Sequence, residues 1–258
     1  MSRDLSRRAW ARGAAGLAGT VAAALALPGC APSDARARLL VHAAASLAAP
    51  FRTLAAAFEA DRPGVRVELN LAGSSDLVAQ LRQGAPGDVL VTADRRTMDR
   101  MDPDALDGGT RVVARNVLVL ITAPGNPRGI RGLADLDAPD TRLAACAPQV
   151  PCGAAAHAFA GVQHVTLHPV TEESSVAGVV AKVTAGQVDA GLAYHSDARA
   201  AGDAVAAVEL PGADRAPNEY PAAVLAESAR PDDARAFVDL LLAERGRRAL
   251  ADAGFLLP

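Results

Sequence analysis

Apolar positions in the first half of the chain change their period several times, and each change marks a predicted element. Residues 38–44 form a short apolar run, and the next apolar positions follow at helical spacing: Leu47, Phe51, Leu54 and Phe58. Residues 65–71 alternate apolar with polar side chains, as a half-buried strand does, before a second helical period over 77–81. A third strand is predicted over 88–93, and Asp94 is placed to cap a third helix. This strand–helix alternation predicts a parallel sheet with helices on both faces.

The same alternation restarts in the second half of the chain. The predicted strands lie over 116–121, 141–145, 165–168, 188–194 and 220–225. Helices are predicted between them, one beginning at Ser174–Ser175 and another opened by Pro231. The length of 258 residues accommodates two lobes of about 100 residues each.

The predicted elements divide between two α/β lobes. We expect the first lobe over 38–115 plus 218–258 and the second over 116–217. Two crossing strands near residues 115 and 217 would join them, and the C-terminal helices would return to the first lobe.

The N-terminus carries the pattern of an export signal. Residues 1–29 contain four arginines ahead of an apolar run, 14–27, that is too short to span a bilayer comfortably. The run ends in Leu-Pro-Gly-Cys30, which resembles the bacterial lipoprotein signal, in which the cysteine is lipidated and becomes the new N-terminus. We therefore expect an anchor at Cys30, a tether over 30–37 and a location on the outer face of the cytoplasmic membrane. The alternative is an ordinary signal peptide followed by an unrelated cysteine. The paired Arg7 and Arg8 resemble a twin-arginine export signal, so both the Sec and the twin-arginine export routes stay open.

Composition narrows the classes of partner. Half of the residues are hydrophobic, so the chain can bury a core without depending on disulfides. It has 26 basic and 29 acidic residues and a formal net charge of -3, with no basic stripe interleaved with aromatics. Nucleic acid is therefore not expected as a partner. An acidic protein does not attract anions through its net charge, so any anion site must be local.

Two cysteines remain once Cys30 is assigned to the lipid. Cys146 and Cys152 would lie in an oxidising compartment, which favours a disulfide over the alternative of two buried thiols. The pair alone does not complete a metal site, and the sequence has no cluster of histidines and cysteines that would do so.

Two predicted strand-to-helix junctions carry serines. Ser46 ends the first strand and opens the first helix, and Ser74 does the same after the second strand. In open α/β sheets, ligands collect at the carboxyl ends of strands, where helix N-termini present free N–H groups to anions. An ordinary N-cap, in which each serine oxygen accepts from its own helix, is the alternative. Gly73 would allow close backbone approach at the second junction.

Four segments along the chain together resemble the molybdate-binding protein of ABC uptake systems. They are Val41–Leu47, Gly73–Ser75, Gly84–Asp94 and Tyr220–Val224, in this order across nearly the whole chain after the export signal. The resemblance implies an α/β, two-lobed periplasmic-binding-protein fold of type II, each lobe a mostly parallel sheet flanked by helices. It also implies a ligand cleft between the lobes, a binding protein rather than an enzyme, and no cofactor.

The resemblance implies a ligand set, position by position. Ser46 and Ser74 would each give a hydroxyl and a backbone N–H from the first lobe. The second lobe would give the N–H of Cys152, the N–H of Val176 and the hydroxyl of Tyr194, with no side chain as a direct ligand of a cation. For Tyr194 the alternative is a core tyrosine with a satisfied hydroxyl. Two carboxylates near the helix starts, Asp76 and Glu173, are expected to point away from the anion and cap helices.

The resulting expectation is a monomeric lipoprotein that captures molybdate, and tungstate as well, and delivers it to the permease subunits of an ABC transporter. A receptor for sulfate or another tetrahedral oxyanion is the alternative within the same class, because only cavity size separates these dianions. An exported α/β hydrolase is a weaker alternative, since there is no Gly-x-Ser-x-Gly motif and only His195 is placed as a candidate base. A surface lipoprotein that acts through protein contacts alone would leave both serine junctions without a role.

Overall fold

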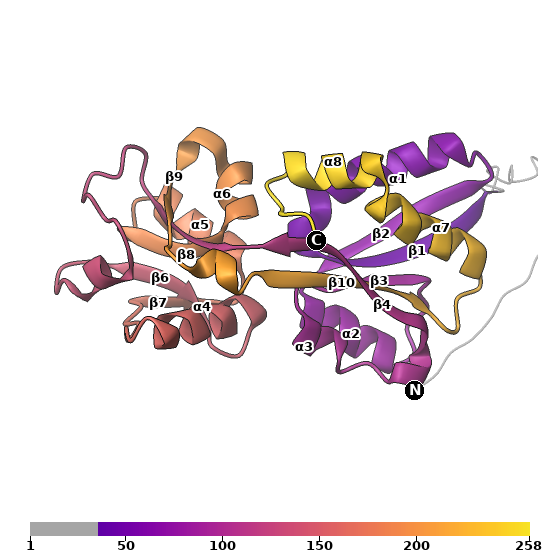
Figure 1. Cartoon of the computed structure of the whole chain (residues 1–258), viewed down its shortest axis with the longest axis horizontal. Coiled ribbons are helices and arrows are strands. Elements are labelled where there is room, and N and C mark those ends of the chain that lie inside the picture. The colour runs from indigo at the N-terminus through magenta and orange to yellow at the C-terminus, as the bar shows by residue number, and fades with distance from the viewer. Residues whose placement is uncertain (1–35) are drawn as a thin grey trace, which may run out of the picture. The chain divides into compact units, whose positions relative to one another are not determined.

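The computed structural model describes residues 36–258. The predicted export signal over 1–29, the lipidation site at Cys30 and most of the tether over 30–37 lie outside the described residues. The described part contains two five-stranded sheets, each covered by helices on both faces (Figure 1). We call each sheet with its helices a lobe.

The first lobe is built on the sheet with strand order β2-β1-β3-β10-β4. Its strands are β1 (Ala37–Ala44), β2 (Val65–Ala72), β3 (Val89–Val91), β4 (Leu106–Asn116) and β10 (Asn218–Leu225). Its helices are α1 (Ala48–Asp61), α2 (Ser74–Arg82), α3 (Arg95–Met98), α7 (Pro231–Leu242) and α8 (Glu244–Asp252), with short 3-10 turns η1 (Ala45–Leu47) and η2 (Pro103–Ala105). The two C-terminal helices thus cover the same sheet as the first helix.

The second lobe is built on the sheet with strand order β7-β6-β8-β5-β9. Its strands are β5 (Leu118–Thr122), β6 (Leu143–Cys146), β7 (Thr171–Glu173), β8 (Ala190–Tyr194) and β9 (Ala206–Glu209). Its helices are α4 (Pro151–Val162), α5 (Val176–Thr184) and α6 (His195–Ala201), with 3-10 turns η3 (Leu133–Asp137), η4 (Gly202–Ala204) and η5 (Ala213–Arg215).

Both sheets are mixed. β1 runs parallel to β2 and β3, whereas β10 runs antiparallel to β3 and β4. In the second sheet β6 runs parallel to β7 and β8, whereas β5 runs antiparallel to β8 and β9. The parallel strands are those joined by helices along the chain, as βαβ units require. The antiparallel pairs come from the segments that cross between the sheets, whose direction hydrophobic periodicity does not encode.

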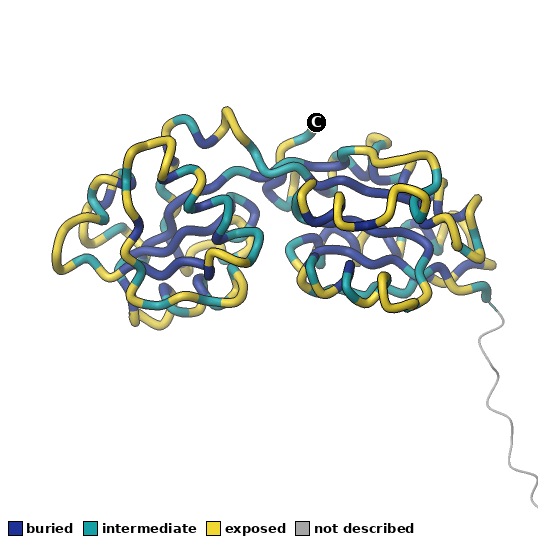
Figure 2. The backbone as a smooth tube through the Cα atoms, turned by 90° about the horizontal axis from the view of Figure 1, so that it is seen from below, coloured by how far each residue is buried: buried dark blue, intermediate teal, exposed yellow. Residues whose placement is uncertain are grey.

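Alternate residues of the strands enter different cores. In β3, Val89 and Val91 belong to the core under α1, α7 and α8, whereas Leu90 belongs to the core under α2 and α3. The first of these cores contains Phe237, which meets the rings of Phe51 and Phe58 edge-on at centroid distances of 6.0 Å and 5.4 Å. Figure 2 shows the strands as buried tubes and the connecting loops as exposed ones. The two-sided burial explains why the central strands are almost wholly apolar.

One predicted strand is wrong. Residues 165–168 form no strand, and the edge strand β7 lies instead at Thr171–Glu173. Leu167 is buried and Val165 half-buried against the core that contains α4, so the apolar spacing there reflects packing of a loop and not a hydrogen-bonded ladder. The crossing strand predicted near residue 115 is β4, but the sequence did not locate its start at Leu106, because that glycine-containing segment has little apolar alternation.

Residues 115–118 and 218–220 run side by side where the chain passes between the sheets. Asn218 in β10 pairs with Asn116 at the end of β4, and β5 begins two residues later at Leu118. The C-terminal segment is tied to the same place, because Arg115 forms a bridge with Leu256. Across residues 36–258, no helix combines the length and apolarity needed to cross a membrane.

Candidate functional site

Ser46 lies in η1, directly after strand β1, and is half-buried. Its Oγ is 3.1 Å from the hydroxyl of Tyr220, a fully buried residue of β10. The residue that caps η1 is Ala44, with no side-chain capping bond. The hydroxyl of Ser46 is therefore not used as an N-cap.

Ser74 is the first residue of α2 and is 4% exposed. Its Oγ accepts a hydrogen bond of 2.9 Å from the backbone N–H of Ala93, just beyond β3. The N-cap of α2 is Gly73, again without a side-chain capping bond. An oxygen that already accepts keeps its proton for a further acceptor.

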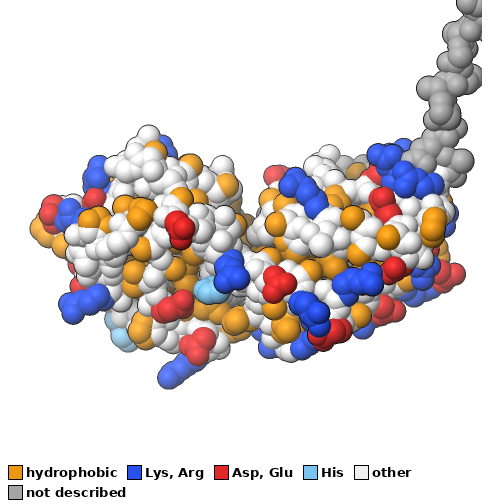
Figure 3. Space-filling view, turned by 90° about the horizontal axis from the view of Figure 1, so that it is seen from above, with side chains coloured by type: hydrophobic (Ala, Val, Ile, Leu, Met, Phe, Trp, Pro, Cys, Tyr) orange, Lys and Arg blue, Asp and Glu red, His pale blue; other side chains and the backbone are white. Residues whose placement is uncertain are grey.

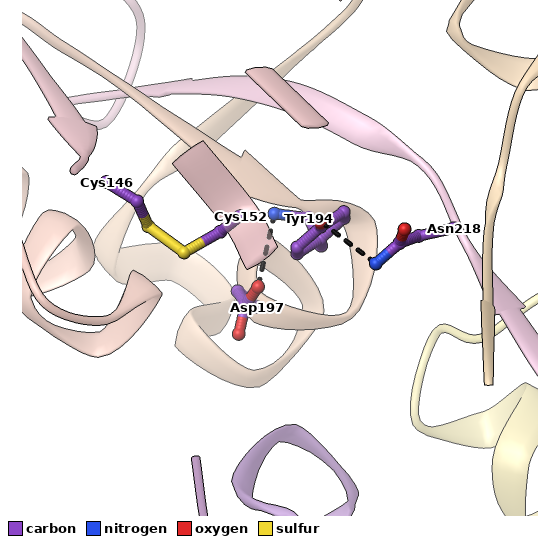
Figure 4. Close-up of a disulfide and its surroundings, with 5 residues drawn as sticks. All are labelled: Cys146, Cys152, Tyr194, Asp197 and Asn218. Atoms are coloured by element: carbon purple, nitrogen blue, oxygen red, sulfur yellow. Dashed lines mark hydrogen bonds between the residues drawn. A yellow bond between two sulfur atoms is a disulfide. The ribbon is translucent and has the colours of Figure 1, made fainter. Parts of the chain in front are cut away.

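Tyr194 ends β8 in the second lobe and is 5% exposed. Its hydroxyl accepts from Nδ2 of Asn218 at 3.1 Å, and the same nitrogen donates to the carbonyl oxygen of Ala93 at 2.6 Å. A continuous chain of contacts therefore runs from Ser74 through Ala93 and Asn218 to Tyr194, joining the two lobes. Figure 4 shows the amide of Asn218 directed at the Tyr194 ring. Sequence reasoning missed Asn218, since a single asparagine near the start of a strand carries no local signal.

Cys152 and Val176 stand at the N-termini of the two longest helices of the second lobe. Cys152 is the second residue of α4 and Val176 the first of α5. N–H groups in these positions have no partner within their own helix. Both side chains are half-buried and pack against the same apolar cluster that contains Tyr194. Three of the five predicted donors are thus brought to one region of the second lobe.

A disulfide joins Cys146 at the end of β6 to Cys152 in the first turn of α4, with a Cα–Cα distance of 5.8 Å (Figure 4). The neighbouring Gly153 has no room for a side chain, because a Cβ there would lie 2.0 Å from the carbonyl oxygen of Ala147. The disulfide and the glycine together hold the start of α4 against the end of β6. The backbone at Cys152 is therefore held by the disulfide to Cys146 and by the close packing of Gly153 against Ala147.

A cavity of about 180 Å³ is lined by residues of both lobes. Ser75, Asp94 and Asn218 line it from the first lobe, and Gln149 and Pro151 from the loop before α4. These are chain neighbours of Ser74 and Cys152 rather than those residues themselves. Tyr194 lines an adjoining cavity together with Asn116 and Asn218.

Burial governs the ionisation of the groups at this place. It raises the pKa of Tyr194 well above its usual value and raises the pKa of Tyr220 to about 12. Both phenols therefore remain protonated, and able to donate, throughout the neutral range. Burial also raises the pKa of Asp197 to about 6, opposed by a hydrogen bond that its carboxylate accepts from the N–H of Tyr194.

Three other carboxylates lie near helix starts, and of these only Asp94 caps its helix. Asp94 caps α3, as the sequence predicts, accepting from the N–H and the hydroxyl of Thr97 at 2.6 Å and 2.8 Å. Glu173 accepts from the hydroxyl of Thr171 at 2.7 Å and lies over the first turn of α5, close to Gly178. Asp76 is exposed, with its carboxylate beside Gly73.

His195 is the base that the hydrolase alternative requires, and its Nδ1 lies 2.9 Å from the carbonyl oxygen of Gly254. No group of three or more His, Cys, Asp or Glu residues that could hold a metal ion occurs within residues 36–258. What the described residues offer is a set of hydroxyl and N–H donors, which suits an anion.

Comparison with known proteins agrees with this chemistry. Residues 39–256 match the family model described as bacterial extracellular solute-binding protein. The chain is 41% identical over 228 residues to the molybdate-binding protein ModA of Mycobacterium tuberculosis, covering 88% of this chain and 87% of that protein. It is 29% identical over 235 residues to the protein of the same name from Escherichia coli, covering 85% and 89%.

A solved structure has the same architecture. The substrate-binding domain of a putative molybdenum ABC transporter from Clostridium difficile superposes with a TM-score of 0.70 at 26% identity, covering 86% of this chain and 99% of that one. The two-lobed α/β fold implied by the sequence resemblance is confirmed by this match and by the two sheets.

Proposed function

Because the chain belongs to the family of bacterial extracellular solute-binding proteins, we propose that it captures molybdate between its lobes and delivers it to an ABC permease. The chain shares 41% identity with a molybdate-binding protein over 88% of its length. The observation that carries the proposal is the contact chain between the lobes, from Ser74 through Ala93 and Asn218 to Tyr194. It supports a site at which donors from both lobes meet.

The ligand set we propose is Ser46, Ser74, Cys152, Val176 and Tyr194. Molybdate carries two negative charges and no proton near neutral pH, so every contact with it must come from a donor. Hydroxyls at Ser46, Ser74 and Tyr194 and helix N-terminal N–H groups at Cys152 and Val176 meet this requirement.

Closure of the lobes is the proposed mechanism. A ligand that touches donors on both lobes binds the closed arrangement more tightly than the open one and shifts the population toward it. The closed surface is then what the permease recognises. The chain acts in this proposal as a carrier and performs no chemical reaction on its ligand.

We further propose that tungstate binds in the same way, because it has the same charge and shape as molybdate.

The proposed protein is a monomer. It is anchored through a lipid on Cys30 to the outer face of the cytoplasmic membrane. Fractionation of cells producing the wild-type chain and the Cys30→Ala variant tests the anchor. Wild-type protein in the membrane fraction and variant protein in the soluble exported fraction is the expected result.

A thermal-shift panel on the purified chain tests the ligand, comparing molybdate, tungstate, sulfate and phosphate with no addition. A ligand that binds only the folded state raises the melting temperature, by an amount that grows with its affinity. Molybdate and tungstate are expected to raise it, and sulfate and phosphate to leave it unchanged. A larger rise in melting temperature with sulfate than with molybdate would identify sulfate as the ligand instead. No rise with any of these anions would refute the binding function.

A further inference from the structure

The side-chain amide of Asn218 can adopt only one orientation. Its Nδ2 lies 2.6 Å from the carbonyl oxygen of Ala93, which can only accept, so the nitrogen end must face that oxygen. The second hydrogen of the same nitrogen is directed to the hydroxyl of Tyr194 at 3.1 Å. Tyr194 must therefore accept from Asn218, and its own proton is left to donate elsewhere.

The same reasoning fixes the amide of Asn116, which is fully buried. Its Oδ1 accepts from the backbone N–H groups of Val117 and Ser196 at 3.1 Å and 3.4 Å, and these groups can only donate. Its Nδ2 consequently donates, to Ser196 at 2.7 Å and to the hydroxyl of Tyr220 at 3.4 Å.

Tyr220 passes this direction on to Ser46. The Tyr220 oxygen accepts from Asn116, which leaves its proton available for Oγ of Ser46, 3.1 Å away, although either hydroxyl can be the donor in this bond. With Tyr220 as the donor, Ser46 accepts and its own proton is directed away from Tyr220. Ser74 is in the same condition, since its Oγ accepts from the N–H of Ala93.

Each hydroxyl of the proposed ligand set thus has a donor beside its oxygen: the N–H of Ala93 at Ser74, the amide of Asn218 at Tyr194 and the hydroxyl of Tyr220 at Ser46. We propose that Asn218 and Tyr220 are positioning residues that orient the protons of Tyr194 and Ser46 toward the bound anion without touching it themselves. This inference rests on the proposed function. A hydroxyl oriented in advance loses no rotational freedom when the anion arrives, so it binds more tightly than a free one.

The arrangement differs from ordinary core packing in what each residue contacts. The hydrogen bonds of the Asn218 amide nitrogen go to Tyr194 and to the residue that orients Ser74. The hydroxyl of Tyr220 lies between Ser46 and Asn116, the last residue of β4. Its ring packs edge-on against the ring of Phe255, with a centroid distance of 5.2 Å. Tyr220→Phe would leave the ring packing in place and remove only the hydroxyl, with its bonds to Ser46 and Asn116.

A double-mutant cycle measured by calorimetry tests the inference, using molybdate as the titrant and the full-length chain. Asn218→Ala is expected to weaken binding about fivefold in the wild-type background and by less than about twofold in the Tyr194→Phe background, because most of its effect passes through that hydroxyl and the rest through Ala93. Tyr220→Phe is expected to behave in the same way with Ser46→Ala. Asn70→Ala is the matched control, since its amide bonds His42 and Gln80 away from the site, and it should leave the affinity unchanged.

The outcomes separate the inference from the proposed function. Equal losses in both backgrounds, or no loss from either Asn218→Ala or Tyr220→Phe, overturn the positioning roles while leaving molybdate binding intact. Failure of the wild-type chain to bind molybdate overturns the proposed function and the inference with it. Melting temperatures of the ligand-free variants show whether each one is folded, and the ring-preserving Tyr220→Phe arm decides the matter if Asn218→Ala does not fold.

Discussion

Asn218 and Tyr194 belong to different sheets, and the Nδ2 of Asn218 lies 3.1 Å from the Tyr194 hydroxyl. Asn218 is the first residue of β10, directly after the chain has crossed back from the second lobe. The contact therefore joins the two lobes at the place where the chain passes between them.

The hydroxyl of Ser74 is the donor whose removal is easiest to interpret, because the residue is buried and its oxygen has a single fixed partner. Ser74→Ala is expected to weaken molybdate binding by about tenfold to a hundredfold, the loss of one hydrogen bond to a charged group. Calorimetry measures this directly. Thr53→Ala is the control, because that exposed hydroxyl on α1 bonds only the carbonyl oxygen of Ala49 and should stay within about twofold of wild type. Equal losses in the two variants would argue against a specific role for the Ser74 hydroxyl.

The disulfide is expected to contribute more to stability than to binding. It closes a loop with a sequence separation of 6, for which chain entropy predicts about 2 kcal/mol. Cys146→Ser should therefore lower the melting temperature by several degrees, about 4 to 8 °C for a chain of this size. Scanning calorimetry of wild type and variant, each with and without reductant, checks it. Reductant should shift the wild type only, and a wild-type melt that does not respond to reductant would contradict the assignment.

Asp197 makes the stability of the fold depend on pH. Burial raises its pKa from 3.8 to about 6, so between these values the folded protein keeps a proton that the unfolded chain releases. Its contribution to the free energy of unfolding is complete below about pH 4 and is lost as the pH rises through about 6, a difference of about 3 kcal/mol.

Asp197→Asn should remove that part of the pH dependence, because the amide still accepts from the N–H of Tyr194 but does not ionise. Denaturant titrations at pH 4.5 and pH 7.5 measure the two free energies, with the exposed Asp203→Asn as the control. The same difference between the two pH values in wild type and Asp197→Asn would rule out Asp197 as its source.

Arg96 and Arg100 line the cavity between the lobes and are exposed, which suits them to attract an anion before it binds. Elsewhere, acidic and basic side chains are interspersed, as on the face drawn in Figure 3. Replacing both Arg96 and Arg100 with glutamine should slow molybdate association about threefold at low ionic strength and leave the dissociation rate unchanged.

Stopped-flow measurements at low and high salt check this steering role, because screening should abolish the difference between wild type and variant. Arg245→Gln with Arg248→Gln on α8 is the matched control, since those side chains pair with Asp61 and Glu244 at the surface. A slower association that persists at high salt would indicate a structural defect instead.

Local patterns predicted the elements that a short stretch of chain determines. The strand–helix units at β1–α1 and β2–α2 follow from the change of hydrophobic period, because a half-buried strand and an amphipathic helix each impose their own spacing. The same reasoning located Ser46 and Ser74 at helix starts and found the cap at Asp94. It failed at 165–168, where loop residues are apolar because they pack and not because they pair.

By itself, the sequence determined the α/β class, the two serine-bearing junctions and the resemblance from which the donor set is proposed. Only the tertiary structure decided what those hydroxyls bond to. Tyr220 lies 174 positions from Ser46, and Asn218 lies 24 from Tyr194, so no local pattern links either pair. The direction of a hydroxyl proton depends on which neighbour occupies its oxygen, and that neighbour is chosen by the crossing of β4 and β10 between the lobes.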